Sequence, residues 1–562
     1  MKPAFLKRKL LPPGEKSKLK KEQLLLILSG IMLGIGFPPF PMPFPILLFF
    51  SFVPYFYVVE KRQTLAGINR ATYLTAFVFN VITIYWVGSW QKQADPFLMI
   101  SGGLLLFANP LFFLIPSTLL YFAGRSLPNR QVIYLLPFFW GAYEYLYMLT
   151  ELSFPWLTLG NGLANFTAFI QISDAIGVIG LSLLVIYINI FLYKAFTNIK
   201  VSKKKFIYYS VTAIIIFIMV LGYGFYKFSA FKETDKTIRV GLIQPNLDPW
   251  GKWEGGNLNE LTQSYISLSQ QAVSKGAKLI VWPETALPVF LLDGSYENIV
   301  DSIYTFLRKN NVYLITGMPD VRYYFKGDKM PPDVVKGEQE NSYYTIYNGI
   351  LLFAPDSWRV QRYGKIKLVP FGERVPFVDT FPFLGDLIKW GVGISGWNIG
   401  RNTANFSMPY LTRQSSNNKI FQSDSIHITS LVCYESIYPY FVTNFVKRGA
   451  ELITVVTNDS WYGKSSGPYQ HKDISILRAV ENRRTVIRAA NGGISCVIDP
   501  LGRTKIQSEL FTKTYIVADV SLEDTETFFT KYPFIVPAIC SVISICIIGL
   551  FIIKKVKKRL KL

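Results

Sequence analysis

The sequence has few histidines, few cysteines and few charged residues. Among its 562 residues, 2 are histidine, 4 are cysteine and 17% are charged. Zinc sites and disulfide frameworks need several such residues at short, regular spacings. We therefore predict a protein without a metal, another cofactor or disulfides. The histidines and cysteines are His427, His471, Cys433, Cys496, Cys540 and Cys546.

The shortage of charge accompanies an excess of apolar side chains. Hydrophobic residues make up 50% of the chain and aromatic residues 16%, and the mean hydropathy is +0.27. Disordered chains and ordinary soluble proteins have fewer apolar residues. Part of this chain is therefore expected to lie in lipid.

Eight apolar stretches are candidate membrane helices, because crossing about 30 Å of hydrocarbon takes about 20 apolar helical residues. The alternative is a set of long helices buried in a protein core. Seven stretches precede residue 237 and one follows residue 530. They run roughly over 23–37, 45–59, 71–90, 97–123, 132–149, 168–196, 206–228 and 533–553.

The net charge of +22 is concentrated beside these stretches, since residues 237–520 carry only +5 of it. A nucleic-acid-binding protein would carry the excess on a folded polar domain, so no nucleic acid is expected. The tails and short connections place 24 Lys and Arg on one side of the membrane and 1 on the other. By the positive-inside rule, both termini are cytoplasmic and the segment 237–522 lies outside.

The segment 237–522 has the pattern of an α/β domain, in which short β-branched runs alternate with amphipathic stretches. It follows a membrane domain with seven helices at 1–236, and 523–562 supply a final helix and a basic tail. Helices are predicted at 257–274, 299–310 and 471–489, and binding loops at 323–340 and 376–425. The predicted strands are IRVGLIQ, KLIVWPE, NVYLITGMPD, YNGILLFAP, ITSLVCYES, ELITVVTND, GISCVIDP and TYIVADV.

A carboxylate and a thiol follow two of these strands, as Glu284 and Cys433. Side chains at strand carboxyl ends leave the packed layer and often react. A thiol with a pKa near 8.5 needs a neighbouring base or cation at neutral pH. Lys365 and Lys367 both qualify as the cation, because strand alternation places them on one face. The alternatives are a buried apolar role for Cys433 and a helix-capping role for Glu284.

Seven motifs occur in order along the chain: FPWLTLGN, IQPNLDPWGKW, VWPETALP, YGKIKLVPFGERVPF, VCYES, TNDSWYG and RAVENRRTVIRAANGG. With them, the α/β segment resembles the nitrilase superfamily. Seven apolar stretches before it and one after it make the whole chain resemble the bacterial apolipoprotein N-acyltransferase family. This resemblance implies an αββα sandwich joined to an α-helical membrane domain of about eight helices.

The resemblance also implies a catalytic triad. Cys433 would be the nucleophile, Glu284 the general base, and Lys365 the group that stabilises the oxyanion. Lys365 is preferred to Lys367 because the family's lysine stands eight residues before the glutamate of PFGE. The family positions with supporting or substrate-binding roles correspond to Glu373, Trp253, Tyr434 and Glu435.

The implied reaction moves an acyl chain from a membrane phospholipid, through a thioester, to the amino-terminal amine of a diacylated apolipoprotein. It would occur in the bacterial inner membrane, with the catalytic domain in the periplasm. Two alternatives are a membrane-anchored amidase that hydrolyses a small molecule, and a non-catalytic receptor for lipids or lipoproteins. The segments 323–344 and 379–425 have no close counterpart in the family.

Several charged residues have two interpretations. Four arginines are expected on one helix with Glu481, as a solvated or ion-paired face more than as a phosphate site. Glu144 and Asp174 lie within apolar stretches, where interhelical hydrogen bonds are the default and a lipid entrance is the alternative. The arginines are Arg478, Arg483, Arg484 and Arg488.

Overall fold

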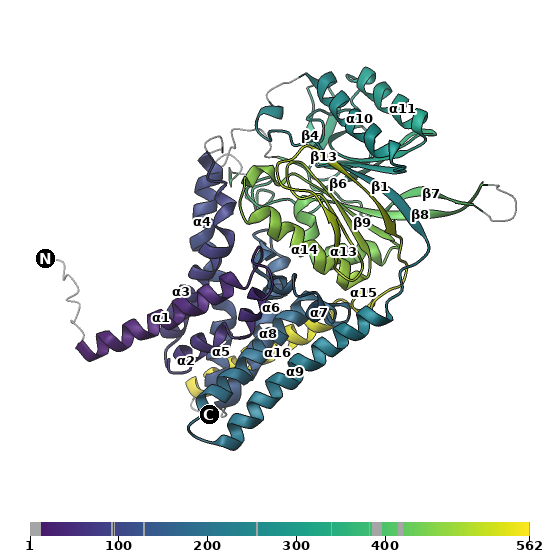
Figure 1. Ribbon diagram of the computed structural model, residues 1–562. Coiled ribbons are helices and arrows are strands. Elements are labelled where there is room, and N and C mark those ends of the chain that lie inside the picture. The colour runs from purple at the N-terminus through teal and green to yellow at the C-terminus, as the bar shows by residue number, and fades with distance from the viewer. Residues whose placement is uncertain are drawn as a thin grey trace, which may run out of the picture.

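The computed structural model describes residues 13–560 except 92–93, 95, 128–129, 254–256, 339, 382, 385–395 and 414–419. The chain forms a bundle of apolar helices and an α/β domain that lies on one end of it (Figure 1). The sequence predicts this combination of a helical membrane domain with an α/β domain.

Five described helical segments are long and apolar enough to cross a membrane. They are α3 with η2 (Leu65–Gly88), α4 with α5 (Pro96–Ser126), α8 (Ser173–Asn198), α9 (Lys203–Ala230) and α16 (Ile535–Arg559).

The other three predicted stretches are helical but shorter, broken or charged, so the expected count of eight spanning helices is not confirmed. The helix that contains stretch 23–37 has lysines in its first half, and the helices that contain stretches 45–59 and 132–149 each follow a 3-10 turn. These elements are α1 (Pro13–Ile35), η1 (Phe44–Phe49) with α2 (Phe52–Val59), and η3 (Arg130–Leu135) with α6 (Leu136–Met148).

The basic connections between the helices meet one another at one end of the bundle. Arg62 forms an ion pair with Glu22 at 2.6 Å, and Lys194 forms one with Glu60 at 2.9 Å. The carboxyl terminus lies at the end opposite the α/β domain (Figure 1).

The α/β domain contains two sheets of seven and six strands. The first has the order β13-β1-β2-β3-β5-β4, with β6 beside β5, and the second has the order β12-β11-β10-β9-β8-β7. The strands are β1 (Thr237–Gln244), β2 (Leu279–Trp282), β3 (Tyr313–Phe325), β4 (Val335–Lys336), β5 (Ser342–Ala354), β6 (Ser357–Gly364), β7 (Phe406–Arg413), β8 (Ile420–Val432), β9 (Leu452–Thr457), β10 (Thr485–Ala490), β11 (Cys496–Ile498), β12 (Thr504–Gln507) and β13 (Thr514–Ser521).

The sheets pack face to face between two helical layers, which confirms the αββα sandwich (Figure 1). The first sheet is covered by helices α10 (Leu258–Ser274) and α11 (Glu297–Asn310). Their apolar faces bury Tyr265, Ile303 and Leu307 against it. Helices α13 (Pro439–Val446) and α14 (Gly467–Asn482) cover the second sheet and lie next to the bundle (Figure 1).

All eight predicted strands are present, but one predicted helix is too long. The stretch 471–489 is helical only to Asn482, where Arg483 turns the chain with a φ of 48°. The β-branched run that follows forms the buried strand β10, as its composition favours. Parts of both predicted loops are strands, namely the end of β3, β4 and β7.

Helix α14 and the turn after it join the α/β domain to the bundle. Gln470 accepts hydrogen bonds from the indoles of Trp86 and Trp156 at 2.9 and 2.8 Å. Glu481 Oε1 accepts one at 2.8 Å from the backbone N–H of Val178, just after a break in α8. These contacts place the sheets' helical cover directly on the membrane helices.

The four arginines are buried, so they form no solvated face, but the ion-paired interpretation is confirmed for three of them, Arg478, Arg483 and Arg488. Arg478 pairs with Glu481 at 2.8 Å, and Arg483 pairs with Asp174 of the bundle at 2.8 Å. Glu144 accepts hydrogen bonds from Trp140 Nε1 and Leu159 N at 2.9 and 2.7 Å. Both acidic residues of the apolar stretches, Glu144 and Asp174, therefore have hydrogen-bond or ion-pair partners inside the protein.

Helix α4 packs closely on η2 through Gly102. A substitution at Gly102 tests this contact, and the same substitution at the adjacent Gly103 is the control. A Cβ at Gly102 would lie 2.4 Å from the Cα and N of Gly88, whereas a Cβ at Gly103 would meet nothing within 4 Å. We expect Gly102→Ala to cost about 1–3 kcal/mol through overpacking and to lower the thermal unfolding temperature in detergent. Gly103→Ala should leave it unchanged or slightly higher, and equal temperatures for the two variants would contradict this packing.

Candidate active site

Three segments bring a lysine and two carboxylates together inside the α/β domain. Glu284 follows β2, Lys365 follows β6, and Glu373 lies in the loop after Lys365. Lys365 Nζ is 2.8 Å from Glu373 Oε1 and 3.6 Å from Glu284 Oε1. All three residues are buried, and Lys365 is only 1% exposed. An ammonium group thus lies between two carboxylates.

Two asparagines hold the carboxylates in place. Asn348 Nδ2 donates to Glu284 Oε1 at 2.8 Å and to Glu373 Oε1 at 2.9 Å. The backbone N–H of Asn458 donates to Glu284 Oε2 at 3.0 Å. Both oxygens of Glu284 are therefore oriented before any ligand binds.

Cys433 lies between two cavities. One, called the polar cavity because it contains three charged side chains, is lined by Cys433 together with Glu284, Lys365 and Glu373. The other, called the apolar cavity, is also lined by Cys433, and one of its walls comes from the bundle. The bundle residues of this wall are Trp86, Val87, Leu98, Ser101, Leu105, Leu152, Phe154 and Trp156.

The backbone of Cys433 presents the thiol at this junction. Cys433 is the first residue of η7 (Cys433–Ile437), directly after β8, and its φ is 49°. A positive φ is uncommon for a residue with a Cβ and is concentrated at functional positions. The sharp turn brings the side chain out of the sheet.

The carboxylates favour the charged form of Lys365, whereas Glu284 disfavours the charged form of Cys433. Burial lowers the pKa of Lys365, but Glu373 and Glu284 outweigh it, so the pKa is raised and the amine stays an ammonium. Burial and then Glu284 raise the pKa of the Cys433 thiol, and Lys365 opposes them. At neutral pH the sulfur therefore keeps its proton until a base removes it.

Glu435 and Tyr434 support the segments that carry Lys365 and Cys433. Glu435 Oε1 accepts hydrogen bonds from the Tyr363 hydroxyl and the Ile366 N–H, both at 2.7 Å, and Oε2 accepts one from Val432 N–H at 2.9 Å. Tyr434 donates its hydroxyl to the carbonyl oxygen of Ser153 in the bundle at 2.7 Å.

Two predicted residues remain, Lys367 and Trp253. Lys367 does not share a strand with Lys365, since β6 ends at Gly364, and its ammonium lies 5.2 Å from the ring centre of Tyr438. Trp253 ends η6 (Gly251–Trp253), and its side chain is outside the described part of the chain. The preceding Lys252 donates to the carbonyl oxygen of Thr285 at 2.7 Å.

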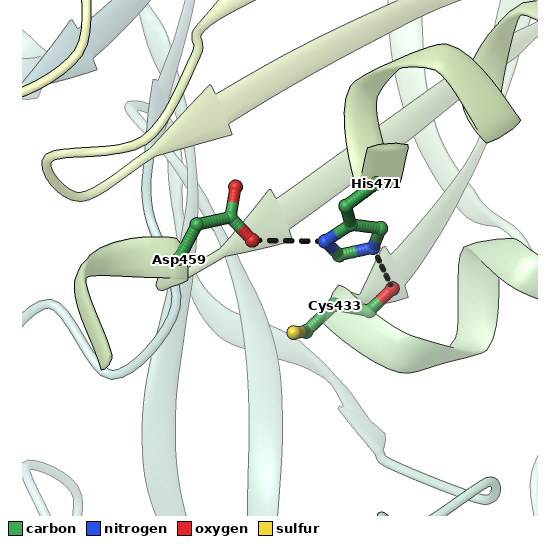
Figure 2. A group of neighbouring side chains, drawn as sticks. All are labelled: Cys433, Asp459 and His471. Atoms are coloured by element: carbon green, nitrogen blue, oxygen red, sulfur yellow. Dashed lines mark hydrogen bonds and ion pairs between the residues drawn. The ribbon is translucent and has the colours of Figure 1, made fainter. Parts of the chain in front are cut away.

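A second buried cluster lies against the backbone of Cys433, and the sequence reasoning missed it. Figure 2 shows Asp459 and His471 beside Cys433. One possible metal-ligand atom from each of the three residues lies within 4.8 Å of the other two. Three such residues could hold a metal ion. However, Arg488 Nη2 lies 2.5 Å from Asp459 Oδ2 and 2.9 Å from His471 Nδ1, and this fixed positive charge opposes a bound cation.

Comparisons with known proteins cover both parts of the chain. Residues 239–528 match the carbon-nitrogen hydrolase family, and residues 29–191 match the apolipoprotein N-acyltransferase N-terminal domain. The apolipoprotein N-acyltransferase of Chlorobaculum tepidum is 33% identical over 93% of this chain and 95% of its own. Those of Geobacter metallireducens and Rickettsia prowazekii are 28% and 29% identical, over 93% and 91% of this chain and 94% and 95% of theirs.

The chain belongs to the apolipoprotein N-acyltransferase family. As a member of this family it is a membrane-associated acyltransferase, and its α/β domain has the nitrilase-like fold.

Several site residues of this family member were not found from the sequence. Asn458 lies near the end of the predicted strand ELITVVTND, and this position was the available signal, whereas Asn348 is the second residue of the predicted strand YNGILLFAP and gave no such signal. His471, Asp459 and Arg488 come from three different segments, so no local pattern connects them. Only the fold brings them together.

Two substitutions should shift the pKa of the Cys433 thiol in opposite directions. Glu284→Gln removes a negative charge that raises this pKa, so iodoacetamide should alkylate Cys433 at lower pH than in the wild type. Lys365→Met removes a positive charge that lowers it, so alkylation should need higher pH. Intact-protein mass across pH 6–10 measures both, with Cys433→Ala as the blank. Shifts of the same sign would contradict the assigned electrostatics.

Proposed function

We propose that this protein transfers a fatty acyl chain from a membrane phospholipid to the amino-terminal α-amine of a diacylglyceryl-cysteine in apolipoproteins. Cys433 is the nucleophile, Glu284 the general base, and Lys365 the cation that stabilises the oxyanion. The observation that carries the proposal is the position of Cys433 between the polar cavity and the apolar cavity. The similar apolipoprotein N-acyltransferases of other bacteria support the acceptor.

The first half-reaction transfers the acyl group to sulfur. Glu284 takes the thiol proton, and the Cys433 sulfur attacks the ester carbonyl of the phospholipid. Lys365 lies beside the negative oxygen that forms, because its ammonium is held by Glu373 and Glu284. The carbon–oxygen bond then breaks, Glu284 returns the proton to the leaving alcohol, and a lysophospholipid leaves.

The second half-reaction transfers the acyl group to nitrogen. The acceptor amine attacks the thioester, Glu284 takes its proton, and the carbon–sulfur bond breaks. The proton then returns to the sulfur, and the product is an amide. Because the donor product leaves before the acceptor reacts, the kinetics are ping-pong.

The apolar cavity suits a lipid substrate. Its wall combines bundle residues such as Leu98 and Phe154 with residues of the α/β domain, so an acyl chain reaches Cys433 without crossing water. A water-soluble substrate gains nothing from this wall. For that reason the amidase alternative, which uses water as acceptor, is the weaker one.

We also propose that the α/β domain lies on the outer side of the inner membrane and that both termini are cytoplasmic. The bias of 24 Lys and Arg on one side to 1 on the other in the tails and short connections supports that orientation under the positive-inside rule. A site on the outer side meets lipoproteins after their export.

The thioester can be detected directly. Incubation of the wild type with phospholipid alone should add one acyl chain by intact mass, and a diacylated lipopeptide should then remove it. Cys433→Ala should add none, and Lys365→Met should add it at least 100-fold more slowly. Lys367→Met is the matched control and should acylate within about threefold of the wild-type rate. An unmodified wild type, or hydrolysis of small amides without lipid, would reject acyl transfer.

The orientation can be tested with two matched lysine-to-cysteine variants. Lys326 lies in an exposed turn of the α/β domain, and Lys204 is exposed at the start of α9. A membrane-impermeant maleimide added to intact spheroplasts should label Lys326→Cys and should label Lys204→Cys only after lysis. The reverse pattern would place the α/β domain in the cytoplasm.

A further inference from the structure

A buried side-chain amide of the polar cavity has a hydrogen-bond donor without a partner. Asn458 lines this cavity together with Cys433, Glu284 and Lys365, and it is only 2% exposed. Among the residues that the structure describes, none accepts a hydrogen bond from its Nδ2. Buried polar groups are nearly always paired, so a donor that is not paired calls for an explanation.

The orientation of this amide follows from its neighbour, Asn491. The backbone N–H of Leu247 donates to Asn491 Oδ1 at 2.8 Å, and Asn491 Nδ2 donates to the carbonyl oxygen of Leu247 at 3.0 Å. A backbone N–H only donates and a carbonyl only accepts, so these contacts fix which end of Asn491 is its NH2 group. The same NH2 group donates to Asn458 Oδ1 at 3.2 Å. The other end of the Asn458 amide is therefore its NH2 group.

The fold places this NH2 group in the cavity of the proposed catalytic residues. Cys433 and Asn458 directly follow β8 and β9, which are adjacent parallel strands. Both residues therefore leave the sheet at the same edge. The backbone N–H of Asn458 donates to Glu284 Oε2 at 3.0 Å, and Lys365 Nζ is 3.6 Å from Glu284 Oε1. The nucleophile, the base, the cation and the unpaired donor thus share one cavity.

The proposed reaction supplies an oxygen atom for this donor. When the Cys433 sulfur adds to the acyl carbonyl, the carbonyl double bond opens and its electron pair goes to oxygen. Lys365 provides one positive neighbour for this oxygen, and an oxyanion accepts more than one hydrogen bond. A buried amide whose orientation is already fixed stabilises the oxyanion without reorganisation.

We propose that Asn458 is a catalytic residue that donates from Nδ2 to the oxyanion, as a second donor beside Lys365. The inference rests on the proposed function, because the oxyanion forms only when Cys433 reacts with an acyl group. The hydrogen bond strengthens as the carbon–sulfur bond forms. It weakens again when the carbonyl double bond returns and the lysophospholipid leaves with the proton from Glu284. Asn458 should therefore affect kcat more than the binding of lipid.

An alanine variant removes the donor and keeps the backbone N–H that binds Glu284. Loss of one oxyanion donor lowers kcat by about 100- to 1000-fold. We expect this loss in the acylation of Cys433 by phospholipid for Asn458→Ala, with KM within about threefold of the wild-type value. The rate is measured by intact mass. The matched control is Asn298→Ala on the exposed side of α11, which should behave as the wild type.

A stable mimic of the oxyanion separates catalysis from a structural role. The Cys433 thiol adds to a long-chain alkyl trifluoromethyl ketone, and the adduct carries a negative oxygen at the same place. Asn458→Ala should weaken inhibition by this ketone by about the factor by which it lowers kcat. The pH at which iodoacetamide alkylates Cys433 should not change, because Glu284 and Lys365 remain. Undiminished inhibition by the ketone, or a shifted pH of alkylation, would overturn the proposal.

A second variant covers the case in which Asn458→Ala does not fold. Asn458→Asp keeps the shape of the side chain and the acceptor for Asn491 Nδ2, but it places an oxygen where the donor was. We expect it to lower kcat at least about 100-fold. A wild type that phospholipid does not acylate rejects the proposed function and this inference with it. A wild type that is acylated, with Asn458→Asp equally fast, rejects the inference alone.

Discussion

The site depends on an ammonium group that is buried between two carboxylates. Burial lowers the pKa of Lys365, but Glu373 and Glu284 outweigh this effect, so the group remains charged. The same contacts place Lys365 beside the polar cavity and orient Glu284. One salt-bridged group therefore sets the charge, the geometry and the protonation of the proposed catalytic residues together.

The second constraint is the joint between the two parts of the molecule. Gln470 and Glu481 contact the bundle from opposite ends of α14, and Tyr434 binds Ser153 beside the nucleophile. The apolar cavity beside Cys433 takes one wall from each part. A nitrilase-like domain alone would lose the bundle wall of the apolar cavity but would keep most of the polar cavity, to which the bundle contributes Leu98. The bundle is thus part of the site as well as its anchor.

Sequence patterns predicted most of the fold because local physics decides it. Buried strands such as β2 and β9 appear as short β-branched runs, and α10 and α11 show their apolar faces directly. The errors have physical causes. Arg483 ends α14 by adopting a left-handed turn that an arginine rarely adopts, so β10 was assigned to the helix. The burial of the arginines could not be predicted, because partners such as Asp174, which pairs with Arg483, are distant in the sequence.

The sequence by itself determined the class of protein, the two-part architecture and the candidate residues Glu284, Lys365 and Cys433. It did so because hydropathy, charge bias and strand-end motifs are local properties. Strand alternation could not choose between Lys365 and Lys367, and nothing local connects Asp459, His471 and Arg488. The tertiary structure separated the two lysines and assembled that cluster, because contacts between residues far apart along the chain exist only after both sheets and α14 have packed.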